Sequence, residues 1–556
     1  MTSFFEKISS FFTASTPYTK AGRLLCMGLC CFSGVTGALI FTCNALWPLA
    51  FLFLIPYALV MLGGRGGWPT VFGCSFVWAF SYYVVMLLWF DEMRHMIFSG
   101  FDDAVARKTV LAALLATSVI EAFVFSAVMS ALRFFRRYSC KLAGVLAFCG
   151  LFVIAETVPE YMGDLTFPWG RLANLVSPFT PFIQSSSLFG GLFVSLLVLL
   201  VNSALALLLL RYNHRKTRVL AAALAAGVLI LNTGFGVVRA ALVSNDASSD
   251  GFGVLLVQGN FGSDNKWSND PDAMRDAYLK LSNEALTDGT EVVVWPETAI
   301  VKSLSGESPT KDMLSEFSKQ NEVVLIVGAF SDNENDRNAP EYNSCWIFTP
   351  DGAENPVYSK QVLVPMGEVV PFEDTMRELM PHLFEDGSII SSTSKGESAV
   401  VVDTGDFKVG TFICYESVVP HIIRENTEQG AELLVMVTND SWFGDSAALT
   451  QHLSHAKLRA CENGRYVLRA ANTGITAVIS PTGEVLCSTD IGVQTTLSGF
   501  AEARSSRTLY SVTGDLVAPL SLLYLILLFL FDPIKKLLGA KKADKPSKIA
   551  QTAMNE

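Results

Sequence analysis

The chain has 556 residues, of which 51% are hydrophobic and only 17% are charged, and its formal net charge is −11. An apolar content this high indicates the membrane class rather than an ordinary soluble protein. Eight apolar runs are long enough to cross a hydrocarbon core of about 30 Å at roughly 1.5 Å per residue. These predicted spans lie near residues 24–43, 45–63, 68–90, 109–132, 142–159, 187–210, 219–238 and 509–531.

Basic residues between the spans predict the orientation of the chain. They cluster without acids after span four and after span six, and again in the C-terminal tail, as Arg133, Arg136, Arg137 and Lys141; Arg211, Arg215, Lys216 and Arg218; and Lys535, Lys536, Lys541, Lys542, Lys545 and Lys548. Basic short loops stay on the cytoplasmic side, so both termini are expected there. The predicted regions are a cytoplasmic N-terminus (1–23), a membrane domain of seven helices (24–240), an outward-facing domain (241–507), an eighth span (508–532) and a basic cytoplasmic tail (533–556).

The outward-facing segment carries the acidic excess and shows no metal-binding pattern. Because the inner loops and the tail are basic, this segment must be acidic, which argues against a nucleic-acid partner. The eleven cysteines form no CxxC pair and the six histidines form no ligand cluster, so we expect neither a metal nor another cofactor. Cys345, Cys461 and Cys487 could pair in an oxidising compartment, but their apolar surroundings favour buried free thiols.

Short, apolar, β-branched runs alternate with helical patterns in this segment. The predicted strands lie at 252–257, 291–295, 323–330, 344–348, 399–402, 408–414, 432–437 and 476–480. Two helix faces appear at spacings of three and four, formed by Met274, Tyr278, Leu281 and Ala285, and by Leu453, Ala456 and Ala460. Strands this apolar are buried on both faces, so helices must pack on one sheet or on two stacked sheets. The predicted fold is a membrane domain of about eight helices plus an outward-facing α/β domain.

Three residues at the ends of apolar runs have the chemistry of an activated-thiol acyl transferase. Cys414 ends one predicted strand, and its thiol needs a base because a free Cys is mostly protonated at neutral pH. Glu297 ends another strand and is the candidate base, while Lys360 offers a positive charge for the oxyanion of a tetrahedral intermediate. Glu368 is a second carboxylate that could orient Lys360 or the incoming group. Taken singly, such residues are more often a structural thiol, a cap and a solvated amine.

The motifs around the three residues resemble those of known proteins. Val294-Trp-Pro-Glu-Thr298, Tyr358-Ser-Lys360 and Cys414-Tyr-Glu416 resemble the nitrilase superfamily, which uses a Glu-Lys-Cys triad on a four-layer αββα sandwich. Further stretches narrow the resemblance to the apolipoprotein N-acyltransferase family, namely Val257-Gln-Gly-Asn260, Trp267, 360–371, Asn439-Asp-Ser-Trp-Phe-Gly-Asp445, 452–472, Thr473-Gly474 and Phe167-Pro-Trp169-Gly. The likeness extends over the whole chain, including seven spans before the domain and one after it.

That resemblance implies a two-step reaction at the outer face of a bacterial inner membrane. Cys414 would attack the sn-1 ester of a phospholipid, typically phosphatidylethanolamine, and the resulting thioester would acylate the N-terminal amine of a diacylglyceryl-cysteine lipoprotein. Glu297 would be the general base, and Lys360 would stabilise the intermediates. The positions matching the family's supporting residues are Glu368, Tyr415 and Glu416, and those matching its substrate-positioning tryptophan and outward loop are Trp267 and Trp169. No cofactor is implied, and a monomer suffices.

A thioester exposed to water would hydrolyse, so apolar loops should shield the thiol. Phe372, Trp442 and Phe443 are candidates, and Trp442 is the one we assign to substrate binding; ordinary core packing explains these residues equally well. Glu121 lies near the middle of span four, where an ionisable group is costly and often functional, although a structural role is favoured here.

Two rival interpretations remain open at this stage. Hydrolases use the same three residues, so a membrane-tethered amidase that releases the acyl group to water fits the triad; the eight spans and the Trp169 loop favour transfer. A transporter or scaffold with a decayed domain is the second rival. The retained chemistry of all three positions and the scarcity of charges in the spans argue against it.

Overall fold

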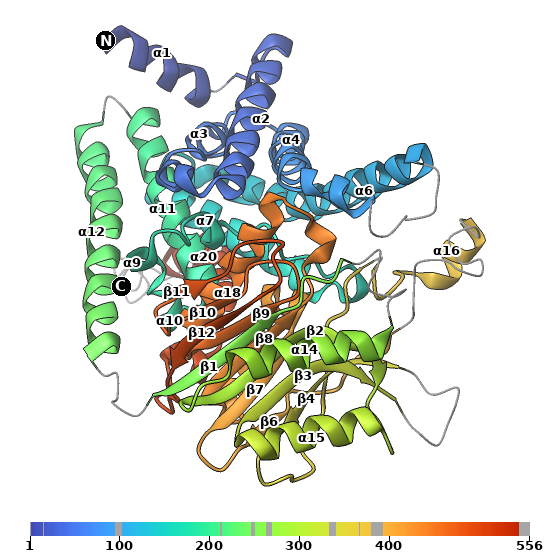
Figure 1. The fold of residues 1–556 in the computed structure, drawn as a ribbon. Coiled ribbons are helices and arrows are strands. Elements are labelled where there is room, and N and C mark those ends of the chain that lie inside the picture. Colours follow the sequence, from blue (N-terminus) through green and yellow to red (C-terminus); the bar gives the residue numbers. More distant parts are fainter. Residues whose placement is uncertain are drawn as a thin grey trace, which may run out of the picture.

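A helical membrane part and an α/β domain with two sheets make up the molecule (Figure 1). The computed structural model describes residues 2–14, 16–94, 103–211, 214–245, 251–262, 270–332, 341–365, 367–379 and 393–543. The helical part comes first in the chain, and the last long helix, α20, returns to it after the sheets.

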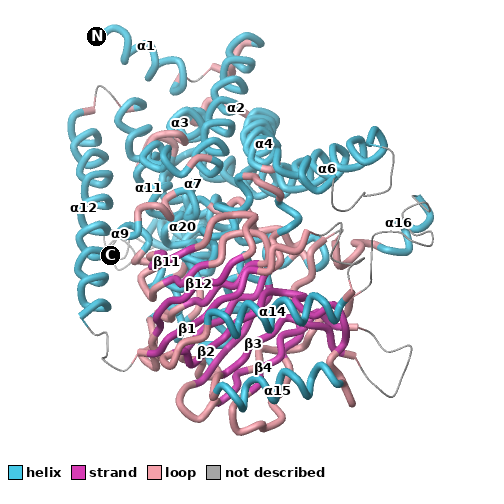
Figure 2. The backbone as a smooth tube through the Cα atoms, viewed as in Figure 1, coloured by secondary structure: helices cyan, strands magenta, loops and turns pink. Residues whose placement is uncertain are grey.

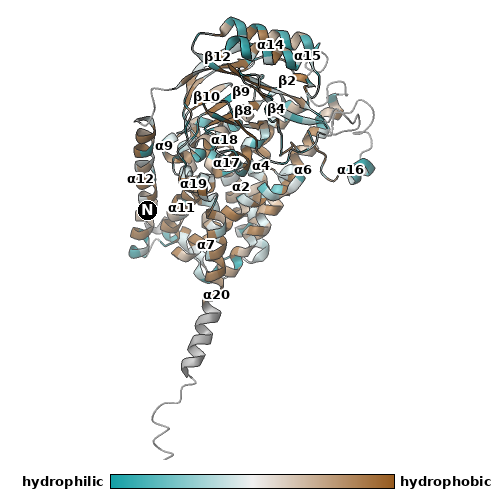
Figure 3. Cartoon of the chain, turned by 90° about the horizontal axis from the view of Figure 1, so that it is seen from below, coloured by the Kyte–Doolittle hydropathy of each residue, from teal (hydrophilic) through white to brown (hydrophobic). Residues whose placement is uncertain are grey.

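Seven helical segments of the described chain are long and apolar enough to cross a membrane, and each overlaps one of the first seven predicted spans. They are Lys20–Thr42 (α2), Asn44–Gly63 (η1, Asn44–Phe51, with α3, Ile55–Gly63), Trp68–Met86 (α4), Asp103–Tyr138 (α6, Asp103–Ser130, with η3, Ala131–Tyr138), Leu142–Tyr161 (α7, Leu142–Thr157, with η4, Val158–Tyr161), Gly191–Leu210 (α11) and Arg215–Ser244 (within α12, Arg215–Asn245). Figure 3 shows these helices predominantly in the colours of apolar residues. A multi-pass membrane part is thus confirmed.

The eighth predicted span begins later than its apolar run suggested. Helix α19 (Leu509–Thr513) ends at Gly514, whose φ of +69° is left-handed, a conformation that favours glycine. The Asp515 side chain then accepts a hydrogen bond from the Val517 amide at 2.9 Å and caps α20 (Val517–Ala543). Residues Val517–Phe531 form the apolar, fully described part of α20.

The basic loops lie at the end of the helical bundle away from the sheets, where arginine side chains bind backbone carbonyls of neighbouring loops. Arg211 Nε donates to the Cys140 carbonyl at 3.0 Å, and Arg136 Nε donates to the Gly64 carbonyl at 2.8 Å. Helix α7 leads from this end to the short helices that face the α/β domain: η5 (Gly163–Leu165), α8 (Leu172–Leu175), α9 (Thr180–Ile183) and α10 (Ser186–Phe189). The N-terminal helix α1 (Thr2–Thr13) and η2 (Leu88–Met93) complete the helical part.

The α/β domain contains two six-stranded sheets (Figure 2). The first has the order β12-β1-β2-β3-β4-β5, with strands Thr495–Ala501, Phe252–Gln258, Thr290–Ser303, Val324–Ser331, Tyr342–Phe348 and Tyr358–Ser359. The second has the order β11-β10-β9-β8-β7-β6, with strands Val485–Ser488, Ala477–Ile479, Val467–Ala471, Leu433–Thr438, Lys408–Ile413 and Val401–Asp403. Three central strands of each sheet are parallel, and the flanking strands pair antiparallel.

Helices cover both outer faces of the paired sheets, which confirms the αββα expectation. Alternate residues such as Val254 and Leu256 of β1 share the core between the sheets with Val435 and Val437 of β8. Helices α14 (Pro271–Ala285) and α15 (Pro309–Asn321) cover the first sheet, and Figure 3 shows polar residues on their outer surface. Helices α17 (Pro420–Glu428) and α18 (Ala447–Asn463) cover the second sheet and continue into the membrane part in one apolar cluster.

Several elements of the domain were not among the predicted runs, including the two-residue strand β5. Strand β9 carries the fully buried Arg469, which interrupts its apolar pattern. Strands β11 and β12 alternate between exposed and partly buried residues, and the amphipathic helix α15 has a strongly polar outer face. The small helices η7 (Cys414–Val418), η8 (Ser441–Phe443) and α16 (Glu373–Leu379) lie in the loops that build the site.

Candidate active site

The three residues predicted to do chemistry come from both sheets: two lie at strand ends and Glu297 lies at an irregularity within its strand. Glu297 lies in β2 of the first sheet, Lys360 follows β5 of the same sheet, and Cys414 follows β7 of the second sheet. The carboxyl ends of neighbouring strands meet at one edge, which is why residues far apart in sequence come together here. Glu297 and Lys360 are also almost completely buried, whereas Cys414 is partly exposed.

Glu297 is turned out of the regular strand by an irregularity in β2. The pairing of β2 with β3 is regular up to Trp295 and resumes only at Ile300. Gly328 of β3 makes room for this bend, because a Cβ there would lie 2.4 Å from the Pro296 carbonyl oxygen and 2.6 Å from the Glu297 Cα. Only glycine permits such a close approach of the two backbones.

Lys360 holds two carboxylates together. Its Nζ lies 3.2 Å from Glu297 Oε1 and 2.8 Å from Glu368 Oε1, and the lysine side chain is fully buried. Burial alone would lower the pKa of the Lys360 ammonium, but the two carboxylates hold that pKa well above its ordinary value. Lys360 is therefore a fixed positive charge held between Glu297 and Glu368.

Two further groups fix the carboxylates. Asn343 Nδ2 donates to Glu297 Oε1 at 2.7 Å and to Glu368 Oε1 at 3.0 Å, while the Asn439 amide donates to Glu297 Oε2 at 2.8 Å. The Asn439 bond joins the end of β8 to the end of β2, so it links the two sheets at the site. Asn343 was missed by the sequence analysis, since a single Asn at the start of an apolar strand carries no distinguishing signal.

Cys414 occupies a strained turn between β7 and η7. Its φ of +50° is left-handed, which costs a non-glycine residue about 1–3 kcal/mol unless the surroundings impose it. Burial, followed by the Glu297 carboxylate, raises the pKa of the Cys414 thiol well above its ordinary value, against the lowering effect of Lys360. The resting sulfur is therefore protonated, and a nucleophilic role requires a base close by.

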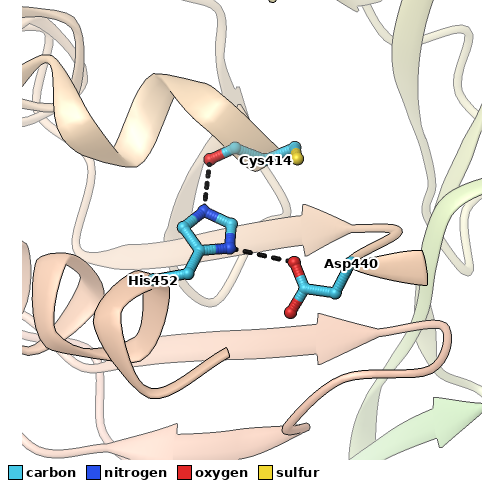
Figure 4. A group of neighbouring side chains, drawn as sticks. All are labelled: Cys414, Asp440 and His452. Carbon is cyan, nitrogen blue, oxygen red and sulfur yellow. Dashed lines mark hydrogen bonds and ion pairs between the residues drawn. The ribbon is translucent and has the colours of Figure 1, made fainter. Parts of the chain in front are cut away.

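A buried network holds the backbone of Cys414 from below (Figure 4). His452 Nε2 lies 3.1 Å from the Cys414 carbonyl oxygen and donates to it, because a carbonyl only accepts. His452 Nδ1 lies 2.9 Å from Asp440 Oδ1, and Arg469 forms an ion pair with the other Asp440 oxygen. All three side chains are completely buried, so the Asp440 carboxylate and the Arg469 guanidinium depend on each other for charge compensation.

Cys414, Asp440 and His452 also form the one group in the described chain where metal-ligating atoms gather. The Cys414 sulfur, an Asp440 oxygen and a His452 nitrogen lie within 4.8 Å of one another. Both ring nitrogens of His452 already face hydrogen-bonding partners, and Asp440 is paired with Arg469. The geometry therefore suits support of the Cys414 backbone better than coordination of an ion.

Glu416 links the loops on either side of the site. Its carboxylate accepts hydrogen bonds from the Tyr358 hydroxyl at 2.8 Å, from the Gln361 amide at 2.6 Å and from the Ile413 amide at 2.7 Å. Ile413 directly precedes the thiol residue and Gln361 directly follows the lysine. The completely buried Glu416 thus ties the loop before Cys414 to the loop after Lys360.

Tyr415 and Trp169 join the site to the membrane part. The Tyr415 hydroxyl donates to the Thr166 carbonyl at 2.8 Å, and the rings of Tyr415 and Trp169 are stacked with centroids 6.3 Å apart. Trp169 also stacks on His452 at 5.7 Å and donates to Gln451 Oε1 at 2.8 Å. Only 1% of Trp169 is exposed, so its place is beneath the site, between the membrane loop and α18.

The remaining predicted residues are placed as follows. Trp442 is half-buried, and its ring lies against Gly367 in the loop that carries Glu368. Trp267 lies outside the described residues. Glu121 is buried on α6, which packs against α4, and Cys345, Cys461 and Cys487 are free thiols.

Comparisons with known proteins agree with the two-part organisation. Residues 254–499 match the carbon-nitrogen hydrolase model, and residues 33–204 match the model of the apolipoprotein N-acyltransferase N-terminal domain. A CN-hydrolase superfamily protein from Xanthomonas campestris, solved with an arsenic adduct in its active site, aligns with 46% of this chain and 91% of its own length, at 20% identity and a TM-score of 0.35.

Curated relatives match across both parts. An apolipoprotein N-acyltransferase from Bradyrhizobium diazoefficiens is 31% identical over 69% of this chain and 72% of its own length. An apolipoprotein N-acyltransferase from Haemophilus ducreyi is 30% identical over 82% of this chain and 86% of its own length. With identities of this size over more than two thirds of each relative, the chain belongs to the apolipoprotein N-acyltransferase family.

Proposed function

We propose that this protein transfers an acyl chain from a membrane phospholipid to the N-terminal amine of a diacylated lipoprotein. The observation that carries the proposal is the arrangement of a protonated thiol, Cys414, beside a buried ammonium, Lys360, that is held between two carboxylates. Membership of the family whose relatives are named apolipoprotein N-acyltransferase supports the substrate class. Phosphatidylethanolamine is the proposed donor, and a monomer is sufficient.

The first step makes an acyl-thioester. Glu297 takes the proton of the Cys414 thiol while the sulfur attacks the sn-1 carbonyl carbon of the phospholipid, and Lys360 stabilises the oxyanion. The carbon–oxygen bond to the glycerol then breaks, and Glu297 returns the proton to the leaving oxygen. The products are the thioester and a lysophospholipid. The resting protonation of Cys414 explains why the base must lie so near.

The second step consumes the thioester. The lipoprotein amine attacks the same carbonyl carbon, Glu297 takes a proton from the nitrogen, and Lys360 again faces the oxyanion. The carbon–sulfur bond breaks and the proton returns to the sulfur, so the enzyme is regenerated. Glu368 and Asn343 keep Glu297 and Lys360 in register through both steps, since each contacts that pair directly.

The site is proposed to face the periplasm from the inner membrane. The basic loops lie together at the end of the bundle opposite the α/β domain, and basic loops stay cytoplasmic. The domain boundaries at 24–240, 241–507 and 508–532 are proposed on the same grounds. Attachment on both sides of the domain holds the thiol near two membrane-anchored substrates, which raises their effective concentration.

One assay separates this function from its main rival. Full-length protein is incubated with phosphatidylethanolamine and a synthetic diacylated lipopeptide, and both products are measured by mass spectrometry. Transfer predicts a triacylated peptide and lysophospholipid in equal amounts. Release of free fatty acid without acylated peptide would identify a membrane-tethered hydrolase instead.

A further inference from the structure

Helix α12 is the least covered of the seven membrane helices. Only 17% of its apolar window is buried, against 39% to 67% in the other six. Large side chains on it are strongly exposed, among them Ile230 at 69%, Leu231 at 74% and Val238 at 58%. Figure 1 shows α12 standing beside the bundle and next to the edge of the α/β domain. One long face of this helix is therefore available to lipid.

The charges on α12 mark both surfaces of a membrane. No charged residue lies between Arg218 and Arg239, which are 239 − 218 = 21 residues apart. At about 1.5 Å per residue this separation is roughly 32 Å, close to the thickness of a hydrocarbon core of about 30 Å. With Arg218 at one surface, Arg239 reaches the headgroup region of the other, on the side of the α/β domain.

A pocket opens at this depth, between α12 and the segment that leads from the domain to α19. Its volume is about 260 Å³, whereas a single water needs only about 10–15 Å³ of such space. Its walls combine apolar side chains, including Leu188, Phe235 and Leu509, with three arginines. The arginines are Arg239, Arg504 and Arg507, and no acidic residue lies among the described residues that line it.

Two of these guanidinium groups have only neutral partners in the described part of the chain. Arg239 donates to neutral groups, such as the Cys461 carbonyl at 3.4 Å, and Arg507 donates to the Ser511 carbonyl at 3.2 Å. The third, Arg504, has an acid nearby. The positive charge of the pocket is thus incompletely balanced, in a protein whose net charge is −11.

We infer that this pocket binds the phosphate of an anionic phospholipid, whose acyl chains lie along the exposed face of α12. Arginine forks match phosphate oxygens in geometry and charge, and the apolar walls suit the adjoining glycerol and chain ends. Cys414, Glu297 and Lys360 are not among the described residues that line the pocket. The bound lipid would thus connect α12 to the α/β domain, and it is a different molecule from the phospholipid that donates the acyl chain.

The test compares lipid binding by the full-length protein and by Arg239→Gln/Arg507→Gln. Detergent-purified protein is titrated with phosphatidylglycerol or with phosphatidylcholine of the same chains, and bound lipid is counted by native mass spectrometry. The wild type should prefer phosphatidylglycerol. Loss of two basic groups near a membrane surface should weaken that binding about 10- to 30-fold, and added salt should weaken it in the wild type.

Control variants distinguish lipid binding in the pocket from nonspecific electrostatic binding and from loss of folding. Lys280→Gln/Lys302→Gln removes two exposed charges from the far side of the domain and should leave binding unchanged. Arg239→Lys keeps the charge and should retain most of the affinity. Equal binding of the two lipids, or unchanged phosphatidylglycerol binding in the double arginine variant, would overturn the inference. So would displacement of the lipid by millimolar inorganic phosphate, which would indicate a site for the free ion.

Discussion

Helices α14 and α18 cover opposite outer faces of the same pair of sheets, but they have very different surroundings. In α14, three of fifteen residues are buried, and ion pairs such as Arg275 with Asp272 lie at its water-facing surface. In α18, thirteen of seventeen residues are buried, because the membrane part covers the side that would otherwise face water. Helix α18 therefore has no side that faces water, whereas α14 has one.

That difference explains the polar residues inside α18. The membrane loops next to it contain short helices and irregular backbone, whose amides and carbonyls need partners when buried. Glu462 accepts from the Gly191 amide at 2.8 Å and so caps α11, while Lys457 donates to the Ser177 carbonyl at 2.7 Å. The polar residues of α18 thus link the membrane part to the α/β domain, and His452 extends this link to the Cys414 carbonyl. Changes here should cost far more than changes in the outer layer.

The largest effect is expected at Lys360. Lys360→Met leaves Glu297 and Glu368 buried without their cation and removes the charge facing the oxyanion. We expect lipopeptide acylation to fall at least about 10²–10³-fold, and stability to fall by about 3–5 kcal/mol. Lys311→Met in the outer layer breaks an ion pair whose carboxylate is 86% exposed, and should stay within about 0.5 kcal/mol of wild type. A Lys360→Met protein with more than a tenth of wild-type activity would refute the assigned role.

The second pair of substitutions compares buried and exposed arginines directly. Arg469→Met leaves the completely buried Asp440 carboxylate without its guanidinium and should destabilise the protein by about 3–5 kcal/mol. Arg275→Met in α14 breaks pairs whose acids are more than half exposed and should cost no more than about 1 kcal/mol. Thermal unfolding in detergent measures both. Equal losses would mean that the inner layer is no more sensitive than the outer one.

The pH dependence of stability should reveal the network formed by Asp440, Arg469 and His452. Burial alone would raise the pKa of Asp440, but Arg469 and His452 hold it well below its ordinary value. A depressed carboxyl pKa contributes stability above the unfolded value near 4, and that contribution is lost as the pH falls toward the folded value. The stability gap between wild type and Asp440→Asn should therefore narrow below about pH 4. A gap that stays constant between pH 6 and pH 3 would be inconsistent with an ionised Asp440.

The smallest effect concerns one hydrogen bond in each layer. Trp169→Phe leaves Gln451 Oε1 without its donor beneath the site and should cost about 1–3 kcal/mol. Trp346→Phe in the outer layer removes a donor from the Phe330 carbonyl, which keeps its bond from the Leu304 amide. That variant should lose less than about 1 kcal/mol. A larger loss of stability in Trp346→Phe than in Trp169→Phe would contradict the greater sensitivity of the inner layer.

The sequence predicted those parts of the molecule that are marked by a periodic or local pattern of residues. Apolar runs of sufficient length revealed the seven membrane helices, and uniformly apolar strands indicated buried sheets. Glu297, Lys360 and Cys414 were singled out because each follows an apolar run, within motifs that resemble a family. The structure places Lys360 Nζ 3.2 Å from Glu297 Oε1, whereas their catalytic roles stay a prediction.

Long-range contacts explain what the sequence did not reveal. Asn343 and His452 act through partners 46 and 38 residues away, and neither has a local pattern that distinguishes it from an ordinary strand or helix residue. Strand β9 was missed because the buried Arg469 looks polar in sequence, although its partner Asp440 makes burial possible. Trp169 was assigned to substrate binding, and its burial between two domains only emerges from the packing of both.

The most direct test of the account is the mass of the protein after exposure to phospholipid alone. Wild-type protein mixed with phosphatidylethanolamine should gain the mass of one acyl chain, located on the peptide that contains Cys414 and removable by a diacylated lipopeptide. Cys414→Ala should gain nothing under the same conditions. Undiminished lipopeptide acylation by Cys414→Ala, or a wild-type adduct on any other residue, would contradict the thioester mechanism.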